Sequence, residues 1–133
     1  MSDKEEIEIW LARAKSNLSI AQQSDIEGAF FEDLCFEAEQ AAEKALKALL
    51  IYVSGDYLKV HSFSLLLSHL ENYLAVPENI KESIELSDYA VQTRYPGDYY
   101  PVGEEEYQRA IDLADRVVCW VEEQIIGKQD KPN

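Results

Sequence analysis

The sequence is poor in residues that interrupt helices, since its 133 residues include only five glycines and four prolines. Most of these fall at the ends of periodic apolar segments, which favours long helices over a strand-rich fold. No apolar run approaches the roughly 20 residues needed to cross a bilayer, so we expect no membrane span. The N-terminal stretch MSDKEEIEIW has no basic segment followed by an apolar one, so no secretory signal is expected.

Cations are also scarce. The chain has 12 Lys and Arg residues against 26 Asp and Glu residues, which gives a formal net charge of −14. A surface this negative repels phosphate backbones over most of its extent, and this excludes a broad nucleic-acid platform. A small local cationic pocket stays compatible with the charge, and Arg94 is the natural candidate for its centre.

There are only two cysteines, Cys35 and Cys119, and they are not arranged as a CxxC pair. Both fall within apolar patterns of helical period, so we expect buried, reduced thiols in a cytoplasmic protein. A disulfide between two helix interiors is the alternative.

Apolar residues recur with helical spacing, and nothing alternates like a strand. The pattern predicts helices over residues 3–23, 29–54, 63–74, 77–95 and 104–126. The expected fold is therefore all-α, an up-and-down bundle of four long helices plus a shorter one. We expect a single helical domain over residues 1–127 and a polar tail over 128–133.

Two of these segments carry more detailed expectations. In the second, five alanines between residues 38 and 48 leave little side-chain bulk, so another helix can pack closely. Glu43 and Lys47 are placed as an i,i+4 ion pair on its outer side. In the fourth, Ile80, Ile84 and Val91 are expected to face the core.

Common catalytic and cofactor motifs are missing. A di-metal carboxylate bundle needs Glu-x-x-His pairs, but leucine stands three residues before both His61 and His69. There is no GxGxxG, P-loop or nucleophile elbow. We therefore expect no metal ion and no cofactor.

The unusual stretch is TRYPGDYYP, from Thr93 to Pro101. Its arginine, Arg94, can hold a phosphate bidentately, and its tyrosines can stack on a base. Those tyrosines are Tyr95, Tyr99 and Tyr100. In the alternative reading the turn is structural, with Arg94 paired to Asp98 or Glu104.

Three stretches together resemble the HEPN (higher eukaryote and prokaryote nucleotide-binding) domain family, in its small, stand-alone prokaryotic branch. They are WLARAKSNLSIAQ, then CFEAEQAAEKALKALLIYVSG followed by HSFSLLLSHL, and the TRYPGDYYP turn. The resemblance implies a helical bundle that forms a homodimer. It also implies a minimal nucleotidyltransferase partner, in a toxin–antitoxin or nucleotidyl-transfer pair.

Many members of this family are metal-independent ribonucleases with an Arg-x(4–6)-His motif. Arg94 matches the arginine, but Tyr99, Tyr100 and Pro101 occupy the positions open to the histidine. A phenol, with a pKa near 10, is a poor general base at neutral pH. The resemblance therefore implies a variant site that is better suited to holding a nucleotide than to cutting RNA.

Three hypotheses follow. The first is a cytoplasmic, homodimeric binding module for a nucleotide, a short RNA or a nucleotidyltransferase, with the turn residues and His61 lining its groove and no catalytic residue. The second is a ribonuclease that uses a relocated base, His61. The third is a dimeric scaffold in which the turn is purely structural.

Overall fold

The computed structural model describes residues 1–57, 59, 62–90 and 101–127. All the regular elements in these ranges are helices, so the predicted all-α bundle is confirmed. They are α1 (Asp3–Ala21), α2 (Phe31–Ser54), α3 (Phe63–Leu70), α4 (Glu78–Lys81), the 3₁₀ helix η1 (Glu82–Tyr89), α5 (Glu104–Glu122) and the π-helix η3 (Glu123–Gly127). None of the helices in these ranges is long and apolar enough to span a lipid bilayer.

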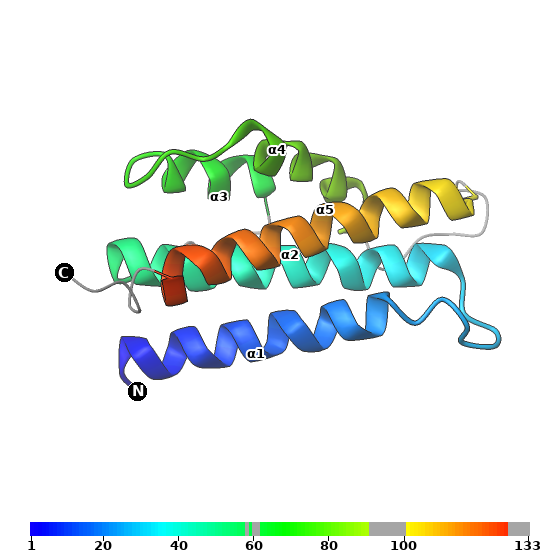
Figure 1. The fold of residues 1–133 in the computed structure, drawn as a ribbon, viewed down its shortest axis with the longest axis horizontal. Helices are drawn as coiled ribbons and strands as arrows, with labels where there is room; N and C mark the ends of the chain where they lie inside the picture. Colours follow the sequence, from blue (N-terminus) through cyan, green and yellow to red (C-terminus); the bar gives the residue numbers. More distant parts are fainter. Residues whose placement is uncertain (58, 60–61, 91–100, 128–133) are drawn as a thin grey trace.

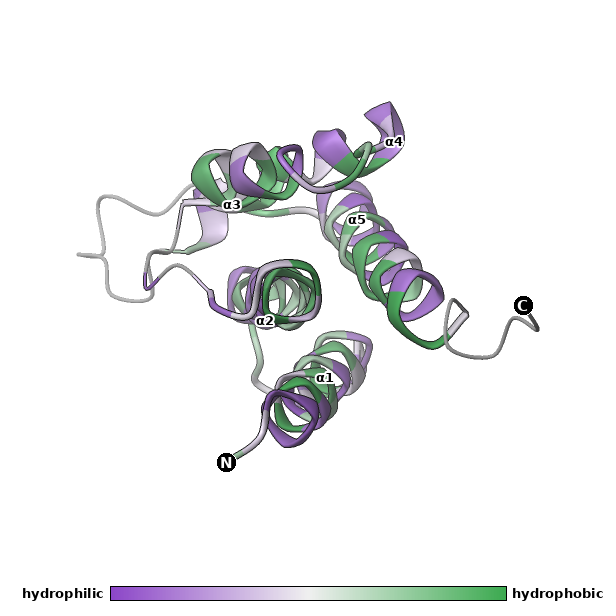
Figure 2. Ribbon diagram, turned by 90° about the vertical axis from the view of Figure 1, so that its left-hand side faces the viewer, coloured by the Kyte–Doolittle hydropathy of each residue, from purple (hydrophilic) through white to green (hydrophobic). Residues whose placement is uncertain are grey.

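Helix α2 lies at the centre of the bundle. It contacts α1, α5, α3 and η1. Figures 1 and 2 show α1 along one side of α2, with α3, α4 and η1 forming a layer on the other side. A helix contacted from so many directions is buried around most of its circumference, so some of its charged residues lie in the core.

The helix ends follow local sequence signals. Ser2 caps α1 by accepting a hydrogen bond from the Glu5 backbone N–H at 3.2 Å, and Ser62 caps α3 in the same way from Leu65 at 3.3 Å. Gly55 ends α2 in the left-handed conformation at φ 83°, which glycine adopts without steric cost. These three boundaries agree with the sequence pattern.

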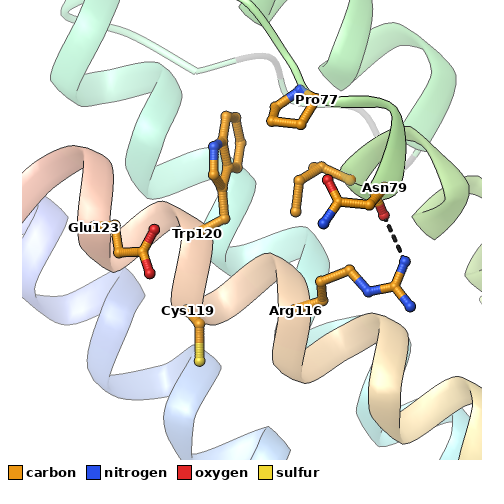
Figure 3. Close-up of a pocket in the computed structure, with 7 residues that line it drawn as sticks. Pro77, Asn79, Arg116, Cys119, Trp120 and Glu123 are labelled. Carbon is orange, nitrogen blue, oxygen red and sulfur yellow. Dashed lines mark hydrogen bonds between the residues drawn. The ribbon is translucent and has the colours of Figure 1, made fainter.

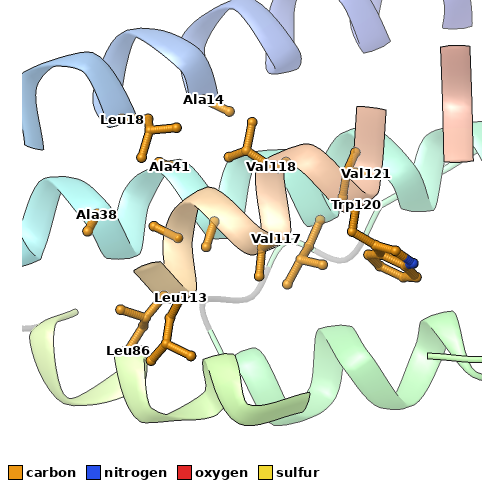
Figure 4. Close-up of a cluster of buried hydrophobic side chains, with 14 of the residues drawn as sticks. Ala14, Leu18, Ala38, Ala41, Leu86, Leu113, Val117, Val118, Trp120 and Val121 are labelled. Atoms are coloured by element: carbon orange, nitrogen blue, oxygen red, sulfur yellow. The ribbon is translucent and has the colours of Figure 1, made fainter. Parts of the chain in front are cut away.

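The core is built around small residues of α2. All five alanines between residues 38 and 48 have no exposed surface, so the predicted close packing on this helix is confirmed. Figure 4 shows Ala38 and Ala41 of α2 among apolar side chains of α1 and α5. Leu86 of η1 closes the cluster from the layer that contains α3.

The fourth helical segment differs from the expectation in its geometry. Only α4 is α-helical, and the chain continues as the 3₁₀ helix η1. With three residues per turn, Ile80, Ser83 and Leu86 face the core, while Ile84 is 46% exposed. The prediction that Ile84 is buried was wrong because it assumed the α-helical period. Val91 lies outside the described residues.

The cysteines differ from each other. Cys35 is completely buried, whereas Cys119 is exposed on α5, and both thiols are free. The prediction of two buried thiols was thus wrong for Cys119. It lies beside Asp115, with Sγ 3.8 Å from Asp115 Oδ1, on the flank of α5 rather than in its apolar stripe.

Candidate functional site

All the site residues predicted from the sequence lie outside the described residues. These are His61, Arg94, Tyr95, Tyr99 and Tyr100. Their predicted roles therefore stay predictions. The structure does describe the residues on either side of segment 91–100. It also describes a cluster of charged side chains buried on α2.

The residues on either side of segment 91–100 are held by hydrogen bonds that involve side chains. Tyr89, the last residue of η1, donates its Oη to Glu106 Oε1 of α5 at 2.5 Å. Burial, followed by this contact with Glu106, raises the pKa of Tyr89, so the phenol stays protonated and remains a donor. The backbone N–H of Val102 donates to Glu32 Oε1 of α2 at 3.4 Å. The two ends of the predicted turn are thus anchored to helices of the core.

A buried tyrosine fixes the start of α5 against the first two helices. Tyr107 is 1% exposed, and its Oη donates to the carbonyl of Ala21, the last residue of α1. Its ring stacks on Phe31, the first residue of α2, at a centroid distance of 4.8 Å. This side chain of α5 therefore contacts the end of α1 and the start of α2, and it fixes the three helices to one another at this end of the bundle.

The surroundings of the predicted turn are acidic. Residues 82–108 contain seven carboxylates and one cation, Arg94. Glu104, Glu105 and Glu106 occupy the first turn of α5, where they already complement the positive end of the helix dipole. The next cations along the chain are already paired, because Arg109 binds Glu85 at 2.7 Å and Arg116 binds Glu82 at 2.6 Å.

The second feature is a row of three charged residues on α2, which we call the buried charged stripe. Glu39, Glu43 and Lys47 follow one another at i,i+4 spacing and have exposed fractions of 0%, 2% and 6%. The Glu43–Lys47 pair was predicted to lie on the outer side of this helix, and that prediction was wrong. The i,i+4 spacing of Glu39 and Glu43 is the sequence signal that places Glu39 on the same side of the helix.

Lys47 lies between two aromatic rings and a carboxylate. Its Nζ is 5.5 Å from the ring centroid of Trp10, 6.0 Å from that of Tyr57 and 4.0 Å from Glu43 Oε2. Trp10 and Tyr57 contact each other edge to face at 5.3 Å. Cation–π attraction strengthens when the cation is desolvated, so these rings partly compensate for the burial of the ammonium group.

Glu39 is the least satisfied charge in the stripe. Gln40 Nε2 donates to its Oε2 at 2.7 Å, whereas its buried Oε1 has no hydrogen-bond partner among the described residues. Burial, and then the neighbouring Glu43, raise the pKa of Glu39 to about 7. A carboxyl group that titrates near neutral pH has the acidity of a general acid or base.

An open pocket of about 270 Å³ lies instead between the start of α4 and the end of α5 (Figure 3). Trp120, Pro77 and Ile80 give it apolar walls. Its cation, Arg116, is already held, because it donates to the carbonyl of Asn79 at 2.8 Å as well as to Glu82. The pocket therefore offers no uncommitted cation for a phosphate.

Cys119 also lines this pocket, although Figure 3 shows its sulfur pointing away from Trp120 and Pro77. Partial desolvation on the surface of α5, and then the neighbouring Asp115, raise the pKa of this thiol, so it is largely protonated at neutral pH and is a weak nucleophile. Among the described residues, no group of three or more His, Cys, Asp or Glu side chains is placed to hold a metal ion.

Comparisons with known proteins agree with this architecture. The family model "HEPN domain" matches residues 7–124. The structure resembles that of TT1696 from Thermus thermophilus, with a TM-score of 0.76 and 36% sequence identity over 90% of this chain and 98% of that one. It also resembles ST0689, an archaeal HEPN homologue, with a TM-score of 0.69 and 31% identity over 90% and 97% of the two chains. No curated protein gave a match. The family match covers most of the sequence, and the chain belongs to the HEPN domain family.

Proposed function

We propose that this HEPN protein is a homodimeric binding protein that docks a minimal nucleotidyltransferase through the turn at residues 93–101. Arg94 contacts a phosphate of the nucleotide that the partner carries, while Tyr95, Tyr99 and Tyr100 stack on its base. The two proteins form a toxin–antitoxin-type pair. The match to the HEPN family supports the choice of partner.

The observation that carries this proposal is the charge distribution around the turn. One cation stands among seven carboxylates in residues 82–108, and the neighbouring Arg109 and Arg116 are neutralised by ion pairs. An extended RNA backbone would be repelled by this region, whereas a basic protein surface would be attracted to it. A partner protein is therefore a better fit than a long nucleic acid.

The sequence of the turn argues against a ribonuclease. No histidine follows Arg94 at the spacing of the family's catalytic motif, and the residues in its place are Tyr99, Tyr100 and Pro101. Transfer of the 2′-hydroxyl proton at neutral pH is catalysed best by a group with a pKa near 7. We expect no appreciable cleavage of single-stranded RNA in the presence of EDTA. Robust cleavage that disappears in His61→Ala would support the relocated-base ribonuclease instead.

A second copy of the chain is part of the proposal. Several large apolar side chains are exposed on the described surface, with Phe30 at 70% and Ile20 at 42%. Contact with another subunit would remove such groups from water. Light scattering should return a particle larger than the 15.2 kDa monomer.

The partner claim is tested by co-expression. The gene beside this one should encode a minimal nucleotidyltransferase, and a tagged version of that protein should retain this chain on affinity resin. The interaction should weaken as salt rises, because it joins surfaces of opposite charge. A neighbouring gene of another class, or a nucleotidyltransferase that does not retain the chain, would contradict the proposal.

A further inference from the structure

The loop between α1 and α2, residues 22–30, exposes two large apolar side chains at one end of the bundle (Figure 1). Phe30 is 70% exposed and Ile26 is 45% exposed. The backbone N–H of Ala29 donates to the carbonyl of Ile26 at 3.2 Å, so the two apolar residues stand at the two ends of one tight turn. The α1–α2 loop patch, as we call it, consists of these two side chains and the exposed carboxylates beside them, Asp25, Glu27 and Asp33.

Phe30 contributes little to the helix that follows it or to the core. It is the N-cap of α2, a position where Ser, Thr, Asp and Asn are preferred because their side chains accept a hydrogen bond from the first turn, and Phe30 makes no such bond. The core contact at this helix end belongs to its neighbour Phe31, whose ring stacks on Tyr107. A residue that breaks a local rule without a gain in packing points to a role outside the fold.

The loop is held in place at both ends by one side chain. Tyr107 donates its Oη to the carbonyl of Ala21, where the loop begins, and its ring stacks on Phe31, just after the loop ends. Gly28 has φ 83°, which lets the chain turn back without steric cost. An apolar group that is already fixed in an exposed position loses less conformational freedom when a partner covers it. The patch is therefore preorganised for contact.

The charge around the patch identifies the class of its partner. Residues 16–43 include seven Asp and Glu residues and no Lys or Arg, and this is the longest stretch of the sequence without a cation. The start of α5 adds the exposed carboxylates of Glu104 and Glu105 at the same end of the bundle. A second copy, a nucleic acid or an anionic membrane would bring like charges together here, whereas a protein surface rich in Lys and Arg would be attracted.

We propose that the α1–α2 loop patch docks a basic surface of the nucleotidyltransferase, with Phe30 inserted into an apolar pocket of that partner and the carboxylates paired to Lys or Arg around it. An aromatic anchor within a polar rim is typical of the strongest contacts in protein interfaces. The inference rests on the partner of the proposed function and adds a contact separate from the turn at residues 93–101. One partner can reach both, because the backbone N–H of Val102, just after the turn, donates to Glu32 Oε1 at 3.4 Å, two residues from Phe30. Phe30 is thereby assigned to the partner and not to a second copy.

The direct test is Phe30→Ser. Serine is a preferred N-cap, so this variant should resist urea at least as well as the wild type, and unfolding will not account for a loss of binding. We expect its affinity for the tagged nucleotidyltransferase to fall about 10-fold or more, the loss of an aromatic anchor. Tyr73→Ser is the control, because Tyr73 is 53% exposed in the segment after α3, which lies at the opposite end of the bundle in Figure 1. It should bind as the wild type does.

Charge reversal tests the acidic rim of the patch. Glu27→Lys should slow association with the nucleotidyltransferase more than Glu8→Lys, which makes the same change of net charge at an exposed position on α1. The difference between the two association rates should shrink at high salt, because salt screens the attraction. Equal effects of the two substitutions would show that the charge of the whole chain attracts the partner, and would overturn the contact with the rim.

The outcomes separate this inference from the proposed function. A nucleotidyltransferase that retains the wild type and Phe30→Ser equally overturns the docking site and leaves the partner standing. A nucleotidyltransferase that does not retain the wild type overturns both. Sedimentation equilibrium of the free chain tests the competing occupant, a second copy. Phe30→Ser should keep the oligomeric state of the wild type, and a shift to the monomer would assign the patch to a second copy instead.

Discussion

Lys47 Nζ lies 4.0 Å from Glu43 Oε2, and both side chains are at least 92% buried. The Lys15–Glu122 pair is shorter, at 2.7 Å, but Lys15 is 54% exposed. From the distances alone, breaking the Lys15–Glu122 pair would be expected to cost more stability than breaking the Lys47–Glu43 pair. Burial reverses this expectation for the cost of breaking each pair. Removing one partner of a desolvated pair leaves the other charge in a medium that solvates it poorly.

We predict that Lys47→Met lowers the free energy of unfolding by about 3–5 kcal/mol, as is typical when one partner of a buried pair is removed. The loss of the cation over Trp10 and Tyr57 adds to this effect. The control, Lys15→Met, should cost at most about 1 kcal/mol because its pair is exposed to solvent. Urea unfolding of both variants gives the comparison, and equal costs would contradict the assignment of the stripe as buried.

Glu39 should make stability depend on pH in a defined direction. Its pKa in the folded protein is raised to about 7, above the ordinary value of 4.5. Between these values the folded state binds more protons than the unfolded state, so the free energy of unfolding falls as pH rises from about 5 to 7 and then levels off. Glu39→Gln removes this titration.

The difference in stability between Glu39→Gln and the wild type isolates that effect, since other titrating groups are shared. Glu39→Gln should gain relative to the wild type as pH rises, reaching an advantage on the order of 2 kcal/mol above pH 7.5. Denaturant titrations at pH 5, 6, 7 and 8 measure this difference. A difference that is flat with pH, or that grows toward acid, would show that Glu39 is ionised and satisfied in the fold.

Tyr107→Phe should destabilise the end of the bundle next to the predicted site. The change keeps the ring that stacks on Phe31 but leaves the carbonyl of Ala21 without the Oη donor. An unsatisfied buried acceptor costs about 1–3 kcal/mol. Tyr73→Phe is the control, because Tyr73 is 53% exposed and should cost almost nothing. Thermal unfolding compares the two variants, and a neutral Tyr107→Phe would be inconsistent with a buried hydrogen bond.

The long helices were predictable because their apolar residues keep the α-helical period over many turns. The first helix was expected over residues 3–23 and is found at Asp3–Ala21, and the second was expected over residues 29–54 and is found at Phe31–Ser54. The fourth segment was harder, since a 3₁₀ helix has a period of three and moves Ile84 out of the core. Periodicity in a short segment does not distinguish the two geometries.

The buried charged stripe on α2 was harder to predict from the sequence. The i,i+4 rule identifies Glu43 and Lys47 as partners, but it says nothing of whether that side of α2 faces water. Burial there depends on long-range packing, including contacts from Trp10 of α1, and periodicity along one helix does not encode it. The same limit applied to Cys119, which stands one residue outside the buried stripe of α5.

The central claim is that Arg94 binds a ligand and does not hold the fold together. The most direct measurement compares the affinity of Arg94→Ala for the nucleotidyltransferase with its free energy of unfolding. Lys4→Ala is the control, since Lys4 is an exposed cation at the start of α1. We predict that Arg94→Ala weakens binding about 10- to 100-fold, the loss of a charge-assisted contact, and costs at most about 1 kcal/mol of stability. Lys4→Ala should change neither quantity. A loss of several kcal/mol of stability in Arg94→Ala with unchanged affinity would contradict the account.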